Sequence, residues 1–182
     1  MYGILRRQYE ESGTDQQERL MLSFDKMFSR ERDTALGDLF SYWRLKCAGT
    51  SNLPNMNEFS SRSLLPQSAR RFTSWLETET SNPLGFVLRN HPKLTAFGDH
   101  SNHRLGELTF KMNAKAIIKE YLYCKSLQRP LYHEIEQTVE SNSRHFVRLL
   151  LPVVDDSGDV TRLVYAVRLI GAAAPPDSPA NS

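Results

Sequence analysis

The stretch "HFVRLLLPVVDDSGDVTRLVYAVRLI" (residues 145–170) decides the fold. Its first part, 145–154, is apolar at both alternating sets of positions, which is typical of a strand buried on both sides of a sheet. The segment "DDSGD" (155–159) has the acidic residues and the glycine of a tight turn. In 160–170, apolar positions alternate with others that include Arg162 and Arg168. The stretch therefore predicts an antiparallel hairpin inside a sheet.

The same reasoning predicts three further strands and a long helix upstream. Residues 131–140 alternate between apolar and polar positions, and 71–77 and 84–90 have strand-like content on either side of a turn at 78–83. Helical spacing runs over 113–127, after a region broken by proline and glycine. The order is two strands, short helices, one long helix and three strands. Because no strand–helix–strand alternation is present, a doubly wound parallel sheet is excluded.

The N-terminal part has a different pattern. The first dozen or so residues are polar and are expected to be loose. Two apolar stripes at helical spacing follow, and they predict two amphipathic helices: Leu20, Phe24, Met27 and Phe28, then Leu36, Leu39, Phe40, Trp43 and Cys47. Residues 49–66 are rich in Ser, Asn and Pro and are expected to form a surface loop.

We therefore expect an α+β fold. It consists of one five-stranded antiparallel sheet with helices on one face, preceded by the two N-terminal helices. The expected division is a flexible segment with amphipathic helices at 1–48, the sheet domain at 49–170 and a disordered tail at 171–182, where the sequence is low in complexity.

Composition limits the function classes. The 182 residues include 23 basic and 21 acidic side chains, and this balance argues against a dedicated nucleic-acid binder. Arg62, Arg70 and Arg71 are either a local basic patch or solvated loop arginines. Two cysteines make no disulfide framework. Neither a membrane-spanning run nor a secretory signal is visible in the sequence, so a cytoplasmic protein is expected.

The stretch "FGDHSNHRLGEL" (97–108) is the one candidate metal site. Asp99, His100 and His103 are metal-ligand types, but no CxxC or H-E-x-x-H motif accompanies them. The polar-loop interpretation is preferred, and a metal-dependent enzyme is kept as the third hypothesis. No activated nucleophile, P-loop or dinucleotide fingerprint is found. The sequence thus gives no support to nucleophilic catalysis, nucleotide hydrolysis or dinucleotide redox chemistry.

Several short motifs, in order, resemble a known family. They are "DLFSYWRLKCAGTSNLP" (38–54), "SLLP" (63–66), "FG" (97–98) with "LGEL" (105–108), "RPLY" (129–132) and "RLLLPVVDDSGDV" (148–160). With the order of the elements, they resemble the PAS_5 family, PAS-like and largely stand-alone proteins of alphaproteobacteria. The resemblance covers residues 36–170 and leaves the helix expected from Gln16 outside it.

The resemblance implies a non-catalytic sensory or regulatory domain. Such a domain would bind a small molecule between sheet and helices and signal through a partner protein that the sequence does not identify. The long helix has no histidine for haem and the short-helix region has no cysteine for flavin, so no cofactor is assigned. His133 is either a non-standard haem ligand or a hydrogen-bonded core histidine. Pocket positions expected from alternation, with Phe97 added as a possible pocket wall, are Trp75, Phe86, Phe97, Tyr121, His133 and Tyr165.

The alternative hypothesis is a dimerisation or interaction module that has the same fold and no ligand. The stripe from Leu36 to Trp43 would then pair across a homodimer, whereas in a monomer it would pack on its own domain. Neither nucleic acid nor membrane is expected as a partner.

Overall fold

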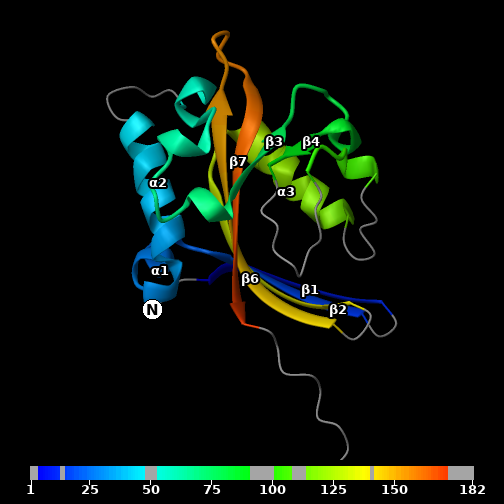
Figure 1. Cartoon of the computed structure of the whole chain (residues 1–182). Coiled ribbons are helices and arrows are strands. Elements are labelled where there is room, and N and C mark those ends of the chain that lie inside the picture. The colour runs from blue at the N-terminus through cyan, green and yellow to red at the C-terminus, as the bar shows by residue number, and fades with distance from the viewer. Residues whose placement is uncertain are drawn as a thin grey trace, which may run out of the picture.

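The fold is built on a seven-stranded antiparallel sheet with the strand order β1-β2-β5-β6-β7-β3-β4 (Figure 1). The computed structural model describes residues 4–12, 15–47, 53–90, 101–107, 114–139 and 142–171. The strands are β1 (Ile4–Ser12), β2 (Asp15–Leu22), β3 (Thr73–Glu77), β4 (Val87–Arg89), β5 (Leu131–Val139), β6 (Asn142–Val154) and β7 (Val160–Gly171). The helices are α1 (Phe24–Phe28), α2 (Thr34–Cys47) and α3 (Ala114–Leu127), joined by several short 3-10 turns.

The hairpin predicted at 145–170 is confirmed as β6 and β7, which pair along most of their length. Its turn forms because the Asp155 carboxylate accepts hydrogen bonds from the backbone N–H groups of Ser157 and Asp159, at 2.9 and 3.1 Å. Gly158 takes a φ of +89°, a conformation that side chains with a Cβ rarely adopt. The acidic residues and the glycine thus have the local roles that the sequence indicates.

Helix α2 covers one face of the sheet. The apolar stripe of this helix is buried in one cluster with β-strand residues that include Trp75, Leu149 and Val164. The indole N–H of Trp43 donates to the carbonyl of Pro152 at 2.8 Å, which ties the helix to β6. The stripe of α2 therefore packs on the sheet of its own chain.

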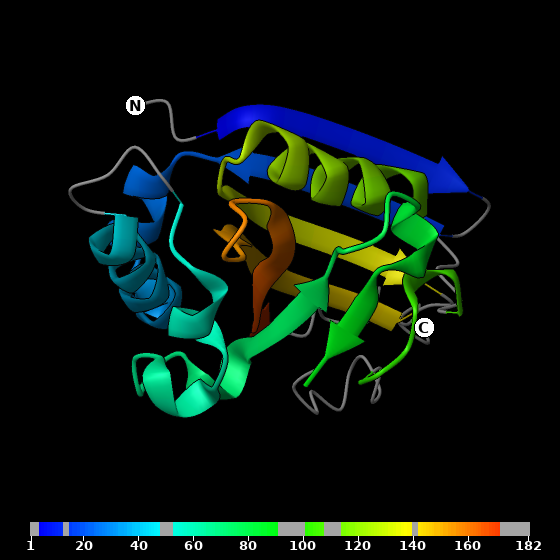
Figure 2. The ribbon, with the colours of Figure 1, turned by 90° about the horizontal axis from the view of Figure 1, so that it is seen from above.

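Helix α3 covers the opposite face, as the two views show (Figures 1 and 2). Tyr121 and Cys124 of this helix are buried against Leu76, Leu150 and Leu163, which point away from α2. The helix expected on one face of the sheet is α3, and the other face is covered by α2, one of the helices expected to precede the sheet domain. Each central strand is apolar on both sides, so both faces need a cover.

The N-terminal segment corrects the expectation of a loose end followed by a helix. Residues 4–22 form the hairpin β1–β2, which extends the sheet by pairing β2 with β5. Leu20 and Leu22 alternate toward the α2 side, and this two-residue period overlaps the helical spacing that begins at Leu20. The sheet thus has seven strands instead of five, and residues 1–48 are not a separate helical segment. Residues 172–182 lie outside the described residues.

A polar network holds the segment before α2 to the sheet. The hydroxyl of Tyr132 donates to the fully buried carboxylate of Asp33. Arg30 and Arg32 both donate to Glu134, at 2.7 and 2.9 Å. Because Tyr132 and Glu134 both lie on β5, the network links the start of α2 to the middle of the sheet.

The two edges of the sheet differ. At β4, the 101–107 segment lies alongside the strand, since the N–H of Leu88 donates to His103 and its carbonyl accepts from Asn102. At β1, no described strand pairs with the outer side. No helix in the described ranges is both long enough and apolar enough to cross a membrane.

Candidate functional site

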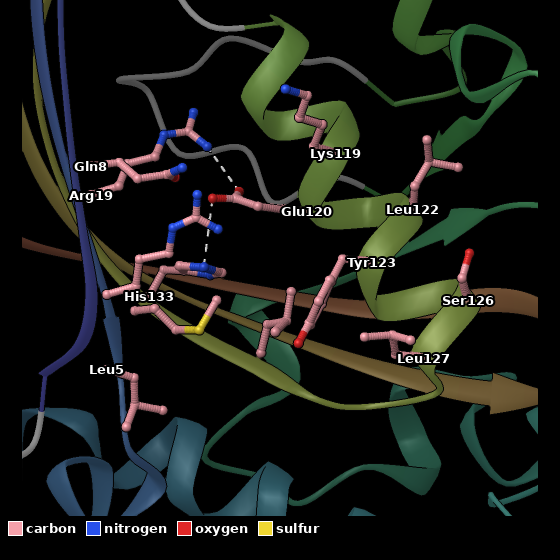
Figure 3. Close-up of a pocket in the computed structure, with 13 residues that line it drawn as sticks. Leu5, Gln8, Arg19, Lys119, Glu120, Leu122, Tyr123, Ser126, Leu127 and His133 are labelled. Atoms are coloured by element: carbon pink, nitrogen blue, oxygen red, sulfur yellow. Dashed lines mark hydrogen bonds and ion pairs between the residues drawn. The ribbon is translucent and has the colours of Figure 1, made fainter.

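A cavity of about 900 Å³ lies between α3 and the strands β1, β2 and β5 (Figure 3). Its apolar wall includes Leu5, Met21, Leu122 and Leu131. Its polar end is formed by Arg19, Glu120 and His133, which come from β2, α3 and β5. The site therefore joins the N-terminal hairpin to the long helix.

Strand register explains why distant residues meet here. His133 is opposite Met21 on one side and opposite Arg148 on the other. Residues directly opposite in antiparallel strands point to the same face, so all three project toward α3. Glu120 lies one position before Tyr121 on the helix side that faces the sheet. The helix thus brings one carboxylate to a row of basic side chains.

The carboxylate of Glu120 is shared by two arginines. Arg19 donates from Nη1 to Oε2 at 2.8 Å, and Arg148 donates from Nη2 to the same oxygen. Nε2 of His133 lies 3.6 Å from the other carboxylate oxygen. The side chains of both arginines are at most 3% exposed, so these charges are held away from water.

Two nitrogen atoms of this cluster have no hydrogen-bond acceptor among the described residues. Nε of Arg19 donates to Gln17 at 3.0 Å, but the buried Nη2 of Arg19 is without a partner. The buried Nε of Arg148 is also without one. A buried guanidinium normally uses its donors, so the cluster has hydrogen-bonding capacity left over.

The cluster keeps a net positive charge at neutral pH. Burial by itself would raise the pKa of Glu120, but Arg148 and Arg19 overcome it and hold the pKa at about 2. Burial, followed by the positive charge of Arg148, lowers the pKa of His133 to about 3. His133 is therefore neutral, and two guanidinium groups face one carboxylate.

Two tyrosines support the buried arginine. The guanidinium of Arg148 lies 5.7 Å from the ring centroid of Tyr121, a cation–π arrangement. Tyr121 in turn contacts Tyr165 edge to face, with centroids 6.3 Å apart. These rings hold the guanidinium between helix and sheet.

The structure brings together part of the predicted pocket. His133 lines the cavity. Tyr121 and Tyr165 do not line it; Tyr121 contacts Arg148, which pairs with the lining residue Glu120, and Tyr165 packs on Tyr121. Phe86 is buried in the α3-side cluster, with the ammonium of Lys125 5.5 Å from its ring centroid, and does not line the cavity. Phe97 lies outside the described residues.

The placement of Trp75 is a correction. Trp75 is opposite Val164, so it points to the α2 face, where its indole donates to the carbonyl of Phe59. The neighbouring Leu76 is the β3 residue that faces α3. Alternation alone shows that the two residues point to opposite faces and does not show which face holds the cavity.

The charged members of the site were missed from the sequence. Arg19 falls within the helix expected from Gln16, and Glu120 looks like an ordinary polar residue of α3. A usable signal existed for Arg148, which interrupts the strand "HFVRLLLPVV" at an inward position. A buried charge needs a partner, so this arginine predicts a buried acid somewhere else in the chain.

The other candidate sites are less organised. Asp99 and His100 lie outside the described residues, while His103 is exposed with Nδ1 3.1 Å from the carbonyl oxygen of Ser101. Within the described ranges, no three potential ligands gather to hold a metal. Arg62 and Arg70 donate to backbone carbonyls of their own chain, so these two arginines hold the segment before β3 in its conformation.

Comparison of the chain with protein-family models, with curated proteins and with solved structures gave no match.

Proposed function

We propose that this chain is a non-catalytic, PAS-like sensory or regulatory module that binds a small molecule in the cavity between α3 and the sheet. The observation that carries the proposal is the cavity itself, with apolar walls and one buried charged end. Its volume of about 900 Å³ lies within the range, roughly 300–1,000 Å³, of known small-molecule sites. The motif resemblance over residues 36–170 supports the same proposal.

The chemistry of the site favours binding over catalysis. A general base works best when its pKa is near the working pH, whereas those of Glu120 and His133 are about 2 and about 3. Burial raises the pKa of the Cys124 thiol, so this group is a poor nucleophile. Glu120 therefore stays charged and His133 stays neutral at neutral pH, which suits binding better than proton transfer.

The cavity is also placed to pass on a signal. One wall is α3 and another is the β1–β2 hairpin, and the Arg19–Glu120 ion pair joins them. A ligand that competes for Arg19 would change how firmly the hairpin is held to the helix. We propose that a partner protein reads this change.

Native mass spectrometry of the purified chain, followed by titration with anilinonaphthalene sulfonate, tests the proposal. We expect a retained small molecule or saturable probe binding. The variant Leu122→Trp should block it by filling the cavity, and Leu84→Trp, at an exposed position elsewhere, is the matched control. If no molecule is retained and the probe fails to bind, or if it binds Leu122→Trp as tightly as the wild type, the proposal is wrong.

A second candidate function is self-association, favoured by the open edge at β1. Leu5 and Tyr9 on this strand are exposed, and its sequence "ILRRQYEES" has a basic pair followed by an acidic pair. A second copy pairing antiparallel about Gln8, the centre of the strand, would bring residue 6 opposite residue 10. A basic and an acidic position of the sequence would then meet twice across a two-fold axis. This places the dimer contact on a strand, in place of the helices expected from the sequence.

Charge-swap variants test self-association by sedimentation velocity. R6E/R7E has an all-acidic edge and E10K/E11K an all-basic one, so each should be monomeric alone. Mixing them should restore the dimer, because the charges are complementary again. A wild-type monomer at all concentrations, or a mixture that stays monomeric, contradicts this candidate.

A further inference from the structure

We infer that the cavity takes a carboxylic acid with an apolar body, its acid group against Arg19 and its body along α3. This inference rests on the proposed function, since it names the chemical class of the ligand for the same site. Three independent observations lead to it: the charge of the polar end, its unused donors, and the exposed apolar side chains at the mouth.

The charge at the polar end is not balanced. Arg19 and Arg148 are both buried and share the single carboxylate of Glu120. Leaving a net positive charge in a low-dielectric site is costly, so an added anion would be stabilised there. Arg6 and Lys119 also line the cavity, and Glu120 is the one acid among its described lining residues. The surrounding potential therefore favours an anion over a cation.

The unused donor belongs to a residue of the cavity wall. Nη2 of Arg19 is buried without an acceptor among the described residues, while Nη1 and Nε are occupied. Figure 3 shows Arg19 at the end of the cavity, next to Gln8 and facing Glu120. Since a guanidinium pairs best with a planar acceptor, a carboxylate is the group that completes this side chain.

The mouth of the cavity carries exposed apolar side chains. Leu5, Tyr123 and Leu127 line it and are 64%, 45% and 49% exposed. Large apolar side chains gathered in this way at one opening mark a binding surface. Figure 3 shows Tyr123 and Leu127 on α3 and Leu5 across from them. A chain or ring system lying between them would remove this surface from water, with its acid group reaching Arg19.

Isothermal titration calorimetry of the full chain with dodecanoate, dodecanol and dodecylamine tests the inference. These probes share one apolar body and differ in the head group. We expect dodecanoate to bind about tenfold or more tighter than dodecanol, because a charge-assisted pair with a buried guanidinium has that effect. Dodecylamine should bind most weakly. Acetate, which has the head group without the body, should not bind measurably.

Substitutions locate the effect. R19Q should reduce the dodecanoate-to-dodecanol preference to about twofold or less, since the unused donor is lost. R7Q is the matched control, because Arg7 is in the same hairpin but pairs with Glu18 at the surface, and its preference should stay as in the wild type. The preference is a ratio, so a general loss of stability in R19Q affects both probes alike.

The possible outcomes separate the inference from the proposed function. If dodecanol or dodecylamine binds as tightly as dodecanoate, or if R19Q keeps the preference, the acid class is wrong while the cavity remains a binding site. If acetate binds as tightly as dodecanoate, the apolar body is wrong. If no probe binds the wild type, the inference fails, and absence of a retained molecule and of sulfonate-probe binding would refute the proposed function as well.

Discussion

Replacing Glu120 by Gln should destabilise the protein strongly. The substitution keeps the size of the side chain and removes the one negative charge that Arg19 and Arg148 share. Breaking a buried ion pair from one side costs about 3–5 kcal/mol, because the remaining charge is left uncompensated. Here two buried cations lose their partner, so the upper part of that range, about 5 kcal/mol, is expected. Domains are stable by about 5–15 kcal/mol in total, so a third or more of the stability would be lost.

Urea denaturation followed by circular dichroism measures this loss. The transition midpoint should fall while the slope stays unchanged, which indicates a change in stability alone. Glu58→Gln is the matched control, since Glu58 pairs with Lys46 at the surface and should contribute about 0–1 kcal/mol. The double variant E120Q/R19Q should recover part of the loss, because it removes one of the uncompensated charges. A loss in E120Q no larger than that of the control would refute the account of the buried cluster.

Three further predictions concern other buried groups. The pKa of His133 in the folded state is about 3, below its ordinary value of 6.5, so the unfolded state binds more protons between these pH values. The free energy of unfolding should therefore fall by about 2 kcal/mol from about pH 7 to about pH 5. Urea denaturation of H133Q at several pH values should show that this pH dependence is lost. Tyr132→Phe should cost about 1–3 kcal/mol in thermal or urea unfolding, because the buried Asp33 loses a donor, whereas Tyr9→Phe at the surface should be near neutral. Cys124 is fully buried and burial raises the pKa of its thiol, so Ellman's reagent should label the half-buried Cys47 first and Cys124 only after unfolding. Fast labelling of Cys124 in the folded C47S variant would contradict this.

The central hairpin, α2 and α3 could be predicted from sequence because local signals and burial agree there. The hairpin turn has its own acidic residue and glycine, and both of its strands have apolar residues at the buried positions. The apolar stripe of α2 matches the buried face of that helix. Where local pattern and tertiary packing point the same way, the prediction is confirmed.

The N-terminal hairpin could not be predicted because the face of β2 that points toward α3 carries buried polar residues. Gln17 and Arg19 are buried on β2, and they pair with Gln137 and Glu120, more than a hundred positions away. No local window contains those partners, so the segment looks solvated. The same reason hides the candidate site, since Glu120 and Arg148 are informative only once the fold has placed them together.

The edges of the sheet set how this protein can assemble. The outer side of β4 is occupied by residues 101–107. Strand β6 is longer than β5, and the part of it that β5 does not pair contains Pro152. Pro152 has no N–H to donate, and its carbonyl accepts a hydrogen bond from Trp43. Of the two edge strands in the described residues, β1 is therefore the one whose outer side is unoccupied. A head-to-tail filament needs two open edges on each molecule. A molecule with one such edge can form a closed pair, and growth into a fibre through the folded sheet stops there.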